Sequence, residues 1–523
     1  MTSSVATVTL EGLAAQPVLV EVSLQRGLPA VYLVGLPDAA VRESIERVRA
    51  ALVSVGEQLP RGRLTVALAP AEVKKGGAHF DLVIALAILV QQGRLPKLSA
   101  RDGFLGQLGL DGSVRAVRGV LPLALALYRR GVRRCFVAGE DARLLRRVVG
   151  LRVVGVRNFA QVVRCLQTGE ETQQHGAASV HQARPSTSRR TAADQSVTHF
   201  DAIVGLRYAK RAVTIAAAGG HNLLLIGPPG TGKTMLARCL ASLLPVLSPE
   251  QQLEVNALWS AAGLLKTWLE RPPLRLPHHV SSAASILGGG PSLQPGDVSL
   301  AHHGVLFLDE LPEFHRDVLE QLRQPLEEGQ VRLARAGNRV AFPARFQLVA
   351  AANPCPCGFA GDELQACTCT PSVLARYQRK LSGPLLDRID LVVRVPRSSL
   401  ATSQEQFLTL DGHPLKKQRT QKQHTEHTLA EEQVRQARQR AARSGVSPNA
   451  QIPGDQIRRL VQLDQSSRDL LERAERTLGL SPRGFVRILR VARTIAHLAS
   501  RDQVTADDVA EALQYRHSFL AQI

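Results

Sequence analysis

The chain has 523 residues, of which 44% are hydrophobic and 21% are charged, as is ordinary for a globular protein of several domains. Its formal net charge of +20 favours polyanionic partners, nucleic acid first. Because no apolar run approaches the ~18 residues of a membrane span and no secretory signal precedes the first domain, we expect a cytoplasmic protein with no membrane partner.

The positive charge lies mainly outside the middle of the chain. Residues 1–170 carry +10 and residues 397–523 carry +6, whereas residues 201–396 carry +3. A generally arginine-rich proteome would also give such a surface, so the charge alone leaves the partner open. It favours nucleic acid without identifying it.

Residues 1–167 alternate between strand-like and helix-like stretches, which predicts a compact α/β domain. Residues 17–27 and 30–37 have the apolar, β-branched composition of strands, and residues 38–56 have helical spacing. Asp111 and Gly112 mark a hairpin turn. The segment therefore carries its own core.

Two polar stretches divide the rest of the chain. Residues 168–198 have almost no large apolar side chain and are expected to form a flexible linker. Residues 397–430 are predicted to be a second polar linker or insertion. Between them lies a central core, residues 199–396, and after them a helical region, residues 431–523.

Residues 222–244 have the pattern of a strand, a glycine-rich loop and a helix, and they match G-x-x-x-x-G-K-[ST]. Glycines let backbone N–H groups surround phosphate oxygens, and the helix N-terminus adds partial positive charge. Lys233 is expected to bridge the β- and γ-phosphates of ATP, and Thr234 to hold Mg²⁺. The predicted nucleotide-binding set is Gly227, Pro228, Pro229, Gly230, Thr231, Gly232, Lys233 and Thr234, joined by Asp309.

A hydrophobic strand at residues 304–308 ends in two acids, Asp309 and Glu310. Asp309 is predicted to hold Mg²⁺ through water, and Glu310 to orient or deprotonate the attacking water. The alternative is that both acids only cap the next helix. The phosphate-binding loop favours the catalytic interpretation.

Three further polar residues, predicted as catalytic, complete the pattern of an AAA+ ATPase. Asn353 ends a third buried strand and suits a sensor beside the γ-phosphate. Arg388 suits an arginine finger that reaches the ATP of a neighbouring subunit, although a salt bridge to Asp387 or Asp390 is the alternative. Arg483 opens a helix of the C-terminal region and suits a second sensor.

Several long segments then resemble one family. Residues 276–290, 293–314, 351–358 and 381–391 closely resemble the magnesium-chelatase-like AAA+ family known as YifB or ComM, and the likeness extends over nearly the whole chain. It implies an α/β protein with a Lon-protease-like (ribosomal S5-like) N-terminal fold, an AAA+ motor with helical insertions and a pre-sensor hairpin, a C-terminal helical lid and a hexameric homo-oligomer.

The resemblance also implies an activity. ComM proteins of naturally competent bacteria act as DNA branch-migration helicases, which implies a role in recombining incoming DNA during transformation. Proteolysis is not expected, because Ala78 stands where Lon-type proteases have serine and Leu121 stands near their lysine.

Cys355, Cys357, Cys367 and Cys369 form a C-x-C…C-x-C cluster. Four thiolates suit structural Zn²⁺, whereas four ordinary reduced cysteines or a redox sensor are the alternatives. The paired histidines at 278–279 and 302–303 are interpreted as polar contacts. ATP and Mg²⁺ are the other cofactors expected.

Residues 327–346 predict a two-stranded basic hairpin just before the strand of Asn353. The family's hairpin at this place projects into the channel of the ring, so Arg332, Arg335 and Arg339 are predicted to bind single-stranded and branched DNA without sequence preference. Arg335 is expected at the tip. The alternative function is a chelatase-like or chaperone-like motor that remodels a protein, although aromatic residues, at 4%, are scarce for an aromatic pore loop.

Overall fold

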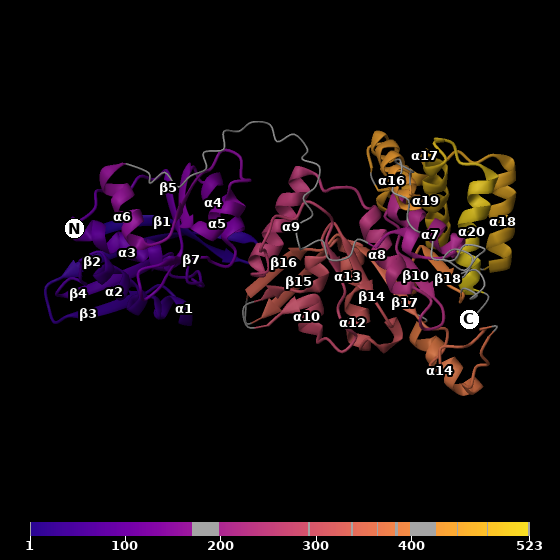
Figure 1. The fold of residues 1–523 in the computed structure, drawn as a ribbon, viewed down its shortest axis with the longest axis horizontal. Coiled ribbons are helices and arrows are strands. Elements are labelled where there is room, and N and C mark those ends of the chain that lie inside the picture. The colour runs from indigo at the N-terminus through magenta and orange to yellow at the C-terminus, as the bar shows by residue number, and fades with distance from the viewer. Residues whose placement is uncertain are drawn as a thin grey trace, which may run out of the picture.

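The computed structural model describes residues 2–169, 198–290, 293–335, 338–362, 364–381, 385–397, 425–446, 448–478 and 480–520. Three parts follow one another along the longest axis: an N-terminal α/β part, a central α/β part and a group of C-terminal helices (Figure 1). Most of the two predicted linkers, 168–198 and 397–430, lies outside the described residues. Among the described helices, none has the length and apolarity needed to cross a membrane.

A long hairpin opens the N-terminal part. Strands β1 (Thr2–Glu11) and β2 (Ala14–Gln25) pair antiparallel along ten positions, and their buried and exposed residues alternate as expected for a sheet with one solvated face. β3 (Ala30–Val34) and β4 (Arg63–Ala69) complete a sheet of order β1-β2-β4-β3. The helix expected over residues 38–56 is divided into α1 (Ala39–Arg42) and α2 (Ser44–Ser54), and the Ser44 hydroxyl at the break donates to Val41 O at 2.6 Å.

Helix α3 (Phe80–Gln91) is almost entirely buried beneath this sheet. A second, parallel sheet follows, with order β5-β8-β9, formed by β5 (Asp102–Leu105), β8 (Arg134–Ala138) and β9 (Arg152–Val156). The expected turn at Asp111–Gly112 joins the short strands β6 (Gln107–Leu108) and β7 (Val114–Arg115). The remaining helices of this part are α4 (Val120–Arg129), α5 (Gly139–Leu145) and α6 (Phe159–Thr168).

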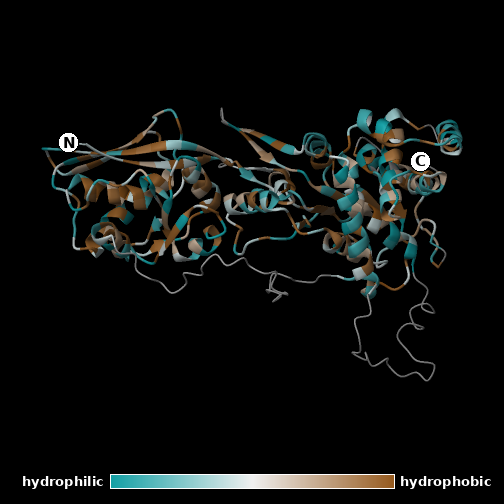
Figure 2. Ribbon diagram, turned by 90° about the horizontal axis from the view of Figure 1, so that it is seen from above, coloured by the Kyte–Doolittle hydropathy of each residue, from teal (hydrophilic) through white to brown (hydrophobic). Residues whose placement is uncertain are grey.

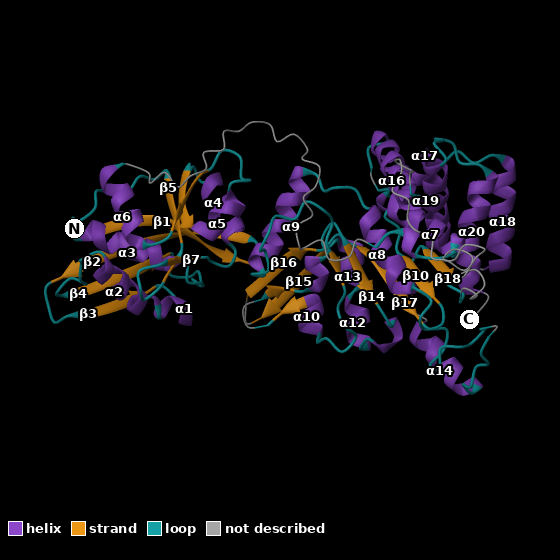
Figure 3. Ribbon diagram, viewed as in Figure 1, coloured by secondary structure: helices purple, strands orange, loops and turns teal. Residues whose placement is uncertain are grey.

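The central part is built on five parallel strands in the order β11-β14-β17-β10-β18 (Figure 3). They are β10 (Leu223–Ile226), β11 (Leu274–Arg275), β14 (Val305–Leu308), β17 (Gln347–Ala352) and β18 (Leu391–Arg394). Every residue of β10, β14 and β17 is buried. Burial on both faces explains why these strands are continuous apolar runs in the sequence.

Helices surround and interrupt this sheet. Before β14 the chain forms η1 (Phe200–Ala202), α7 (Arg207–Gly219), α8 (Lys233–Leu243), α9 (Pro249–Ala261), α10 (Ala283–Leu287), β12 (Gly288–Gly289), β13 (Gln294–Pro295) and α11 (Asp297–Leu300). After β14 it forms η2 (Leu311–Glu313), α12 (Arg316–Gln321), α13 (Arg323–Glu328), the hairpin β15 (Gln330–Arg335) and β16 (Asn338–Pro343), α14 (Pro371–Leu381) and η3 (Leu386–Arg388).

The C-terminal helices pack against α7 and the β18 side of the sheet (Figure 1). They are α16 (Glu426–Arg443), η4 (Asn449–Gln451), α17 (Gly454–Leu460), α18 (Gln465–Leu478), α19 (Pro482–Leu498) and α20 (Ala506–Leu520). Helix α16 begins inside the range predicted as a polar linker, because the Thr425 hydroxyl caps it by accepting from Thr428 N. Hydrophobic residues lie mainly in strands and inward helix faces (Figure 2).

The N-terminal and central parts touch through α4 and α9. Ser260 on α9 accepts hydrogen bonds from Gly119 N at 2.9 Å and from Leu121 N at 3.2 Å. The β1–β2 turn also reaches the hairpin of the central part, since a Cβ on Gly12 would lie 2.1 Å from Val340 Cγ1. The N-terminal part is therefore packed directly against the element predicted to contact DNA.

Candidate active site

The glycine-rich loop joins β10 to α8, as the sequence predicts. Gly227 follows β10 immediately, and a Cβ there would lie 2.2 Å from Val395 O, so a larger residue would displace the neighbouring strand end. Gly230 and Gly232 have φ of +78° and +85°, which side-chain-bearing residues rarely adopt. Thr231 Oγ1 donates to Pro228 O at 2.9 Å and closes the loop. This backbone leaves room for phosphate oxygens against the α8 N-terminus.

Lys233 is the first residue of α8, and its side chain is buried within the loop. Its Nζ donates to Gly227 O and Pro228 O, both at 2.8 Å, and to Asn353 Oδ1 at 3.3 Å. Burial lowers the pKa of Lys233 from its ordinary value. Phosphate oxygens could replace the carbonyl oxygens as acceptors, so the ammonium is already held where an anion would lie.

Thr234 and Asp309 meet across the loop. Thr234 Oγ1 donates to Asp309 Oδ2 at 2.9 Å, which brings the phosphate-binding helix to the end of β14. A hydroxyl and a carboxylate are the oxygen donors that Mg²⁺ takes alongside phosphate and water. The two residues predicted to hold the magnesium ion therefore fit it.

The backbone of Glu310 has a φ of +53°, a left-handed conformation that residues other than glycine rarely adopt. Its N–H donates to Asp309 Oδ1 at 3.0 Å, and its Oε2 lies 3.4 Å from His279 Nδ1. The first contact holds the backbone of Glu310 to Asp309, and the second gives the Glu310 carboxylate a partner on the neighbouring segment. The sequence indicates polar contacts for His279 but does not identify Glu310 as its partner.

Asn353 follows β17 and comes within hydrogen-bond distance of the Lys233 ammonium, as noted above. The backbone carbonyl oxygen of Asn353 accepts a hydrogen bond from Tyr377 Oη at 3.1 Å. Burial raises the pKa of Tyr377 above its ordinary value. Tyr377 lies on α14, just after the cysteine cluster. The structure thus assembles Lys233, Thr234, Asp309, Glu310 and Asn353 at one edge of the sheet.

Arg388 and Arg483 lie at the other edge. Asn222 and Asp390 precede β10 and β18, which pair in parallel from Leu223 and Leu391 onward. The phosphate-binding loop follows the opposite end of β10, about 13 Å away along the strand. Within one chain, neither arginine belongs to the nucleotide-binding set.

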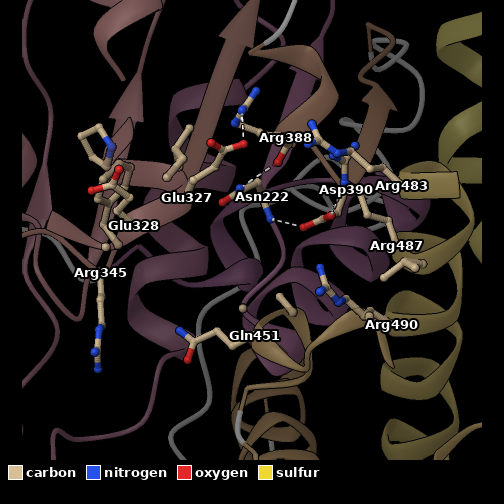
Figure 4. Close-up of a pocket in the computed structure, with 18 of the residues that line it drawn as sticks. Asn222, Glu327, Glu328, Arg345, Arg388, Asp390, Gln451, Arg483, Arg487 and Arg490 are labelled. Atoms are coloured by element: carbon tan, nitrogen blue, oxygen red, sulfur yellow. Dashed lines mark hydrogen bonds and ion pairs between the residues drawn. The ribbon is translucent and has the colours of Figure 1, made fainter. Parts of the chain in front are cut away.

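The two arginines share a cavity of about 670 Å³ (Figure 4). Arg388 ends η3, and Arg483 stands in the first turn of α19, which Ser481 caps through its hydroxyl. Arg345, Arg458, Arg487 and Arg490 line the same cavity, together with Glu327, Glu328 and Asp390. Burial is the main cause that lowers the pKa values of Arg487 and Arg490 from the ordinary arginine value. The cavity is suited to a multiply charged anion.

Arg388 does have an ion-pair partner, but it is neither of the aspartates considered from the sequence. Its Nη2 contacts Glu327 Oε1, and its carbonyl accepts from Asn222 Nδ2 at 2.8 Å. Asp390 instead accepts from Asn222 N at 3.1 Å and lies 3.7 Å from Arg487 Nε. An acidic pair before a basic hairpin, Glu327–Glu328, was the only sequence signal for this contact.

The four clustered cysteines converge, with all sulfur atoms within 4.8 Å of one another. Cys355 Sγ lies 3.2 Å from Cys357 Sγ and 3.7 Å from Cys367 Sγ. A tetrahedral Zn²⁺ with ~2.3 Å bonds to sulfur places its ligands about 3.8 Å apart. Backbone N–H groups of Phe359 and Thr368 lower the pKa of Cys357 to about 5, and Ala360 N donates to Cys355 Sγ at 3.2 Å. The donor set fits zinc.

The cysteine loop is packed against the phosphate-binding loop. A Cβ on Gly358 would lie 2.8 Å from Pro229 Cδ. Arg397, just after β18, is 5.0 Å from the centre of the Phe359 ring and 3.3 Å from Asp362 Oδ2. The loop therefore braces one side of the nucleotide site.

A second group, Glu254, His302 and His303, has ligand-type atoms close together but fits hydrogen bonding better than a metal. His302 Nδ1 accepts from Arg345 N at 3.0 Å, so the ring proton lies on Nε2 and points to Glu254 Oε2 at 3.0 Å. Burial lowers the pKa of His302 to about 4. This ring is neutral and already has both nitrogens engaged, in agreement with the expected polar contacts.

The hairpin separates its three arginines onto two faces. Arg332 lies opposite Ala341 and Arg339 opposite Ala334, so these two share the exposed face, and Arg332 pairs with Glu328 at 3.1 Å. Arg335 lies opposite Asn338, on the face that carries Leu333 and Val340 lower down. The sequence favours a turn at Gly337–Asn338; Gly337 lies outside the described residues, whereas Asn338 is the first residue of β16 and pairs with Arg335. Arg332, Arg335 and Arg339 are all exposed.

The N-terminal positions tested for a protease dyad carry no nucleophile or base. Ala78 lies in the turn before α3, and Leu121 is fully buried in α4. Leu121 packs into a core cluster with Ala257 of the central part. The position has become part of an interdomain contact.

Comparisons with known proteins agree with this geometry. The family pattern described as magnesium chelatase, subunit ChlI matches residues 199–403, that of subunit ChlI of Mg-chelatase matches residues 20–141, and that of the ChlI C-terminal region matches residues 425–516. A Mycobacterium tuberculosis protein is 42% identical over 98% of both chains. The YifB protein of Escherichia coli is 38% identical and competence protein ComM of Haemophilus influenzae 39% identical, each over 97% of this chain and 95% of the relative.

Proposed function

Because the chain belongs to the YifB and ComM family of magnesium-chelatase-like AAA+ proteins, we propose that it is an ATP-hydrolysing motor that acts on DNA as a ring of identical subunits. The observation that carries the proposal is the division of the site. The phosphate-binding residues and the arginine cavity lie at opposite edges of one parallel sheet. A complete site therefore needs two subunits, with the arginines of one facing the nucleotide of the next.

The chemistry follows from the residues at the nucleotide edge. Lys233 binds the β- and γ-phosphates, and Thr234 and Asp309 hold Mg²⁺, which neutralises charge on the phosphates. Glu310, directed by His279, orients the attacking water, and Asn353 positions it beside the γ-phosphate. Arg388 and Arg483 from the neighbouring subunit stabilise the negative charge of the transition state. A hexamer is the proposed ring.

DNA is the proposed substrate because a basic hairpin leads directly into the strand of Asn353. β16 ends at Pro343 and β17 begins at Gln347, so only three residues separate the hairpin from the strand that ends beside Lys233. Exposed arginines on such a hairpin contact phosphates whatever the base sequence. The name of the Haemophilus relative, competence protein ComM, supports a role in competence. We propose branch migration of incoming DNA during transformation as the form that this role takes.

A synthetic Holliday junction tests this function. With ATP, the wild-type protein should resolve the junction into duplexes, and Lys233→Ala should not, because it removes the phosphate-binding ammonium. Lys266→Ala is the matched control, since Lys266 is an exposed lysine outside the site. Absence of junction binding at low salt would sink the proposal.

The hairpin has its own test in Arg335→Ala. We expect basal ATP hydrolysis to be largely unchanged and DNA-stimulated hydrolysis to fall, since the substitution removes a phosphate contact without touching the nucleotide edge. The measurement is the ratio of turnover with and without single-stranded DNA. Equal stimulation in the variant and the wild type would count against a role at the pore.

We also propose that Cys355, Cys357, Cys367 and Cys369 hold a structural zinc ion. The near-tetrahedral sulfur separations and the Ala360 N–H group directed at Cys355 support it. Metal analysis of the purified protein should give one zinc per chain and none after Cys367→Ser with Cys369→Ser. A wild-type protein without zinc, prepared with zinc in the medium, would exclude the site.

A protein-remodelling motor is the alternative. The family patterns are those of magnesium chelatase, and a 30% identical magnesium-chelatase subunit of Rhodobacter capsulatus matches 33% of this chain. ATP hydrolysis stimulated by a protein partner, and not by any DNA, would favour it. The basic hairpin favours DNA.

A further inference from the structure

The ion pair between Arg388 and Glu327 joins η3 to α13, the helix that precedes the hairpin (Figure 4). The Arg388 side chain is 15% exposed, whereas that of Glu327 is 53% exposed. Arg388 is the residue proposed to reach the neighbouring subunit's ATP, so Glu327 occupies the guanidinium that a γ-phosphate would need. The two acceptors compete for one donor group.

The backbone of Arg388 is fixed to the sheet. Asn222 Nδ2 donates to Arg388 O at 2.8 Å, and Asn222 Oδ1 accepts from Leu348 N at 2.8 Å. Ile389, which follows Arg388, is 1% exposed. Motion of the finger is therefore confined to its side chain.

Glu327, unlike Arg388, is connected to the hairpin. It lies in the last turn of α13, and Gly329, with φ of +67°, leads from that helix directly into β15. Gly329 N donates to Pro325 O at 2.9 Å, and Gly329 O accepts from Ala344 N at 2.7 Å, so both strands of the hairpin are tied to the end of α13. A tilt of the hairpin moves Glu327 relative to the fixed backbone of Arg388.

We propose that Glu327 is a positioning residue that restrains the arginine finger until DNA moves the hairpin. This rests on the proposed DNA motor. When the hairpin engages a phosphate backbone, α13 shifts, the carboxylate leaves Arg388, and the guanidinium turns to the γ-phosphate of the neighbouring subunit. The cations Arg345, Arg483 and Arg487 in the same cavity attract that phosphate. DNA contact is thereby converted into ATP hydrolysis.

Glu327→Gln tests the restraint, because it keeps the shape of the side chain and removes its charge. Without DNA, we expect turnover at saturating ATP to rise up to about five-fold over the wild type, the range of a partly exposed ion pair. Stimulation by DNA should fall by the same factor. Glu320→Gln is the matched control: Glu320 forms an exposed ion pair with Arg316 on α12 and should change neither value.

A second variant separates the restraint from a merely structural effect. In an Arg388→Ala background, Glu327→Gln should leave the residual ATPase rate unchanged, since no finger remains to be released. Equal DNA-independent turnover in Glu327→Gln and the wild type would overturn the restraint, as would the same change in both backgrounds. If DNA fails to stimulate the wild type while Glu327→Gln still raises turnover, the DNA motor is wrong and the restraint stands.

Discussion

The two edges of the central sheet differ in how their functional residues are supplied. At the nucleotide edge, a continuous loop from Gly227 to Thr234 is completed by side chains that follow two neighbouring strands, Asp309 and Asn353. At the arginine edge, the cavity draws on α13, η3, α17 and α19, which are far apart in the sequence. The first edge is built around one continuous loop, and the second gathers arginines from separate helices whose positive charge suits an anion.

This difference gives the two edges different dependence on assembly. Nucleotide binding needs only local backbone and one lysine, so a single subunit should bind ATP. In the proposed ring, hydrolysis requires the arginine cavity of a neighbouring subunit to approach the phosphates. The contrast can be tested by breaking each edge separately.

Lys233→Ala and Arg388→Ala should give the largest effects, and they should differ in kind. Both should lower ATP turnover by roughly 1,000-fold, because each removes a charge that stabilises the transferred phosphoryl group. Lys233→Ala should also weaken binding of a fluorescent ATP analogue, whereas Arg388→Ala should retain it. Lost nucleotide binding in Arg388→Ala would show that the finger acts within its own chain.

Mixing the two inactive variants should restore part of the activity. In an equimolar mixture, about a quarter of the interfaces join an intact phosphate-binding loop to an intact finger if subunits mix at random in a closed ring. Turnover of the mixture should therefore exceed that of either variant alone by far, at equal total protein. No recovery after confirmed subunit exchange would contradict a shared site.

The nucleotide edge could be predicted residue by residue because its signals are local. Gly227, Gly232 and Lys233 have the fixed spacing of a phosphate-binding loop. Asp309 and Asn353 each follow an apolar run that predicts a buried strand. The cysteine cluster was visible for the same reason. Parallel strands carry their polar residues at their ends, so sequence order is enough to place them at one edge.

The arginine edge could be predicted only in part, because its contacts join residues that no sequence pattern connects. Arg388 and Arg483 were found as candidates, but their common cavity depends on how α19 packs against α7 and α20. The partner of Arg388 is 61 residues away. Likewise, the alternation of side chains along one strand separates Arg332 from Arg335, but only the register between the two strands places Arg339 on the face of Arg332. Tertiary packing decides such contacts.

A pair of glycine variants asks whether the cysteine loop belongs to the nucleotide edge. Gly358 and Gly361 both have positive φ, +89° and +73°, but a Cβ on Gly358 would lie 2.8 Å from Pro229 whereas one on Gly361 would meet nothing within 4 Å. Gly358→Ala should therefore weaken ATP binding by about ten-fold through displacement of the phosphate-binding loop. Gly361→Ala should cost only about 1 kcal/mol of unfolding free energy from backbone strain. Equal nucleotide affinity in both variants would show that the loop does not support the site.

The smallest expected effects distinguish two arginines on one face of the hairpin. Arg332 and Arg339 each lie opposite an alanine on the paired strand, but Arg332 also forms an ion pair with Glu328 at 3.1 Å. Binding of DNA by Arg332 requires that ion pair to be given up, and the gain in affinity is reduced accordingly. Arg339→Ala should lower the salt dependence of single-stranded DNA binding by about 0.7 in slope, and Arg332→Ala by less. Fluorescence anisotropy over a range of salt concentrations measures both slopes, and a larger change for Arg332→Ala would show that the ion pair with Glu328 does not reduce the contribution of Arg332 to DNA binding.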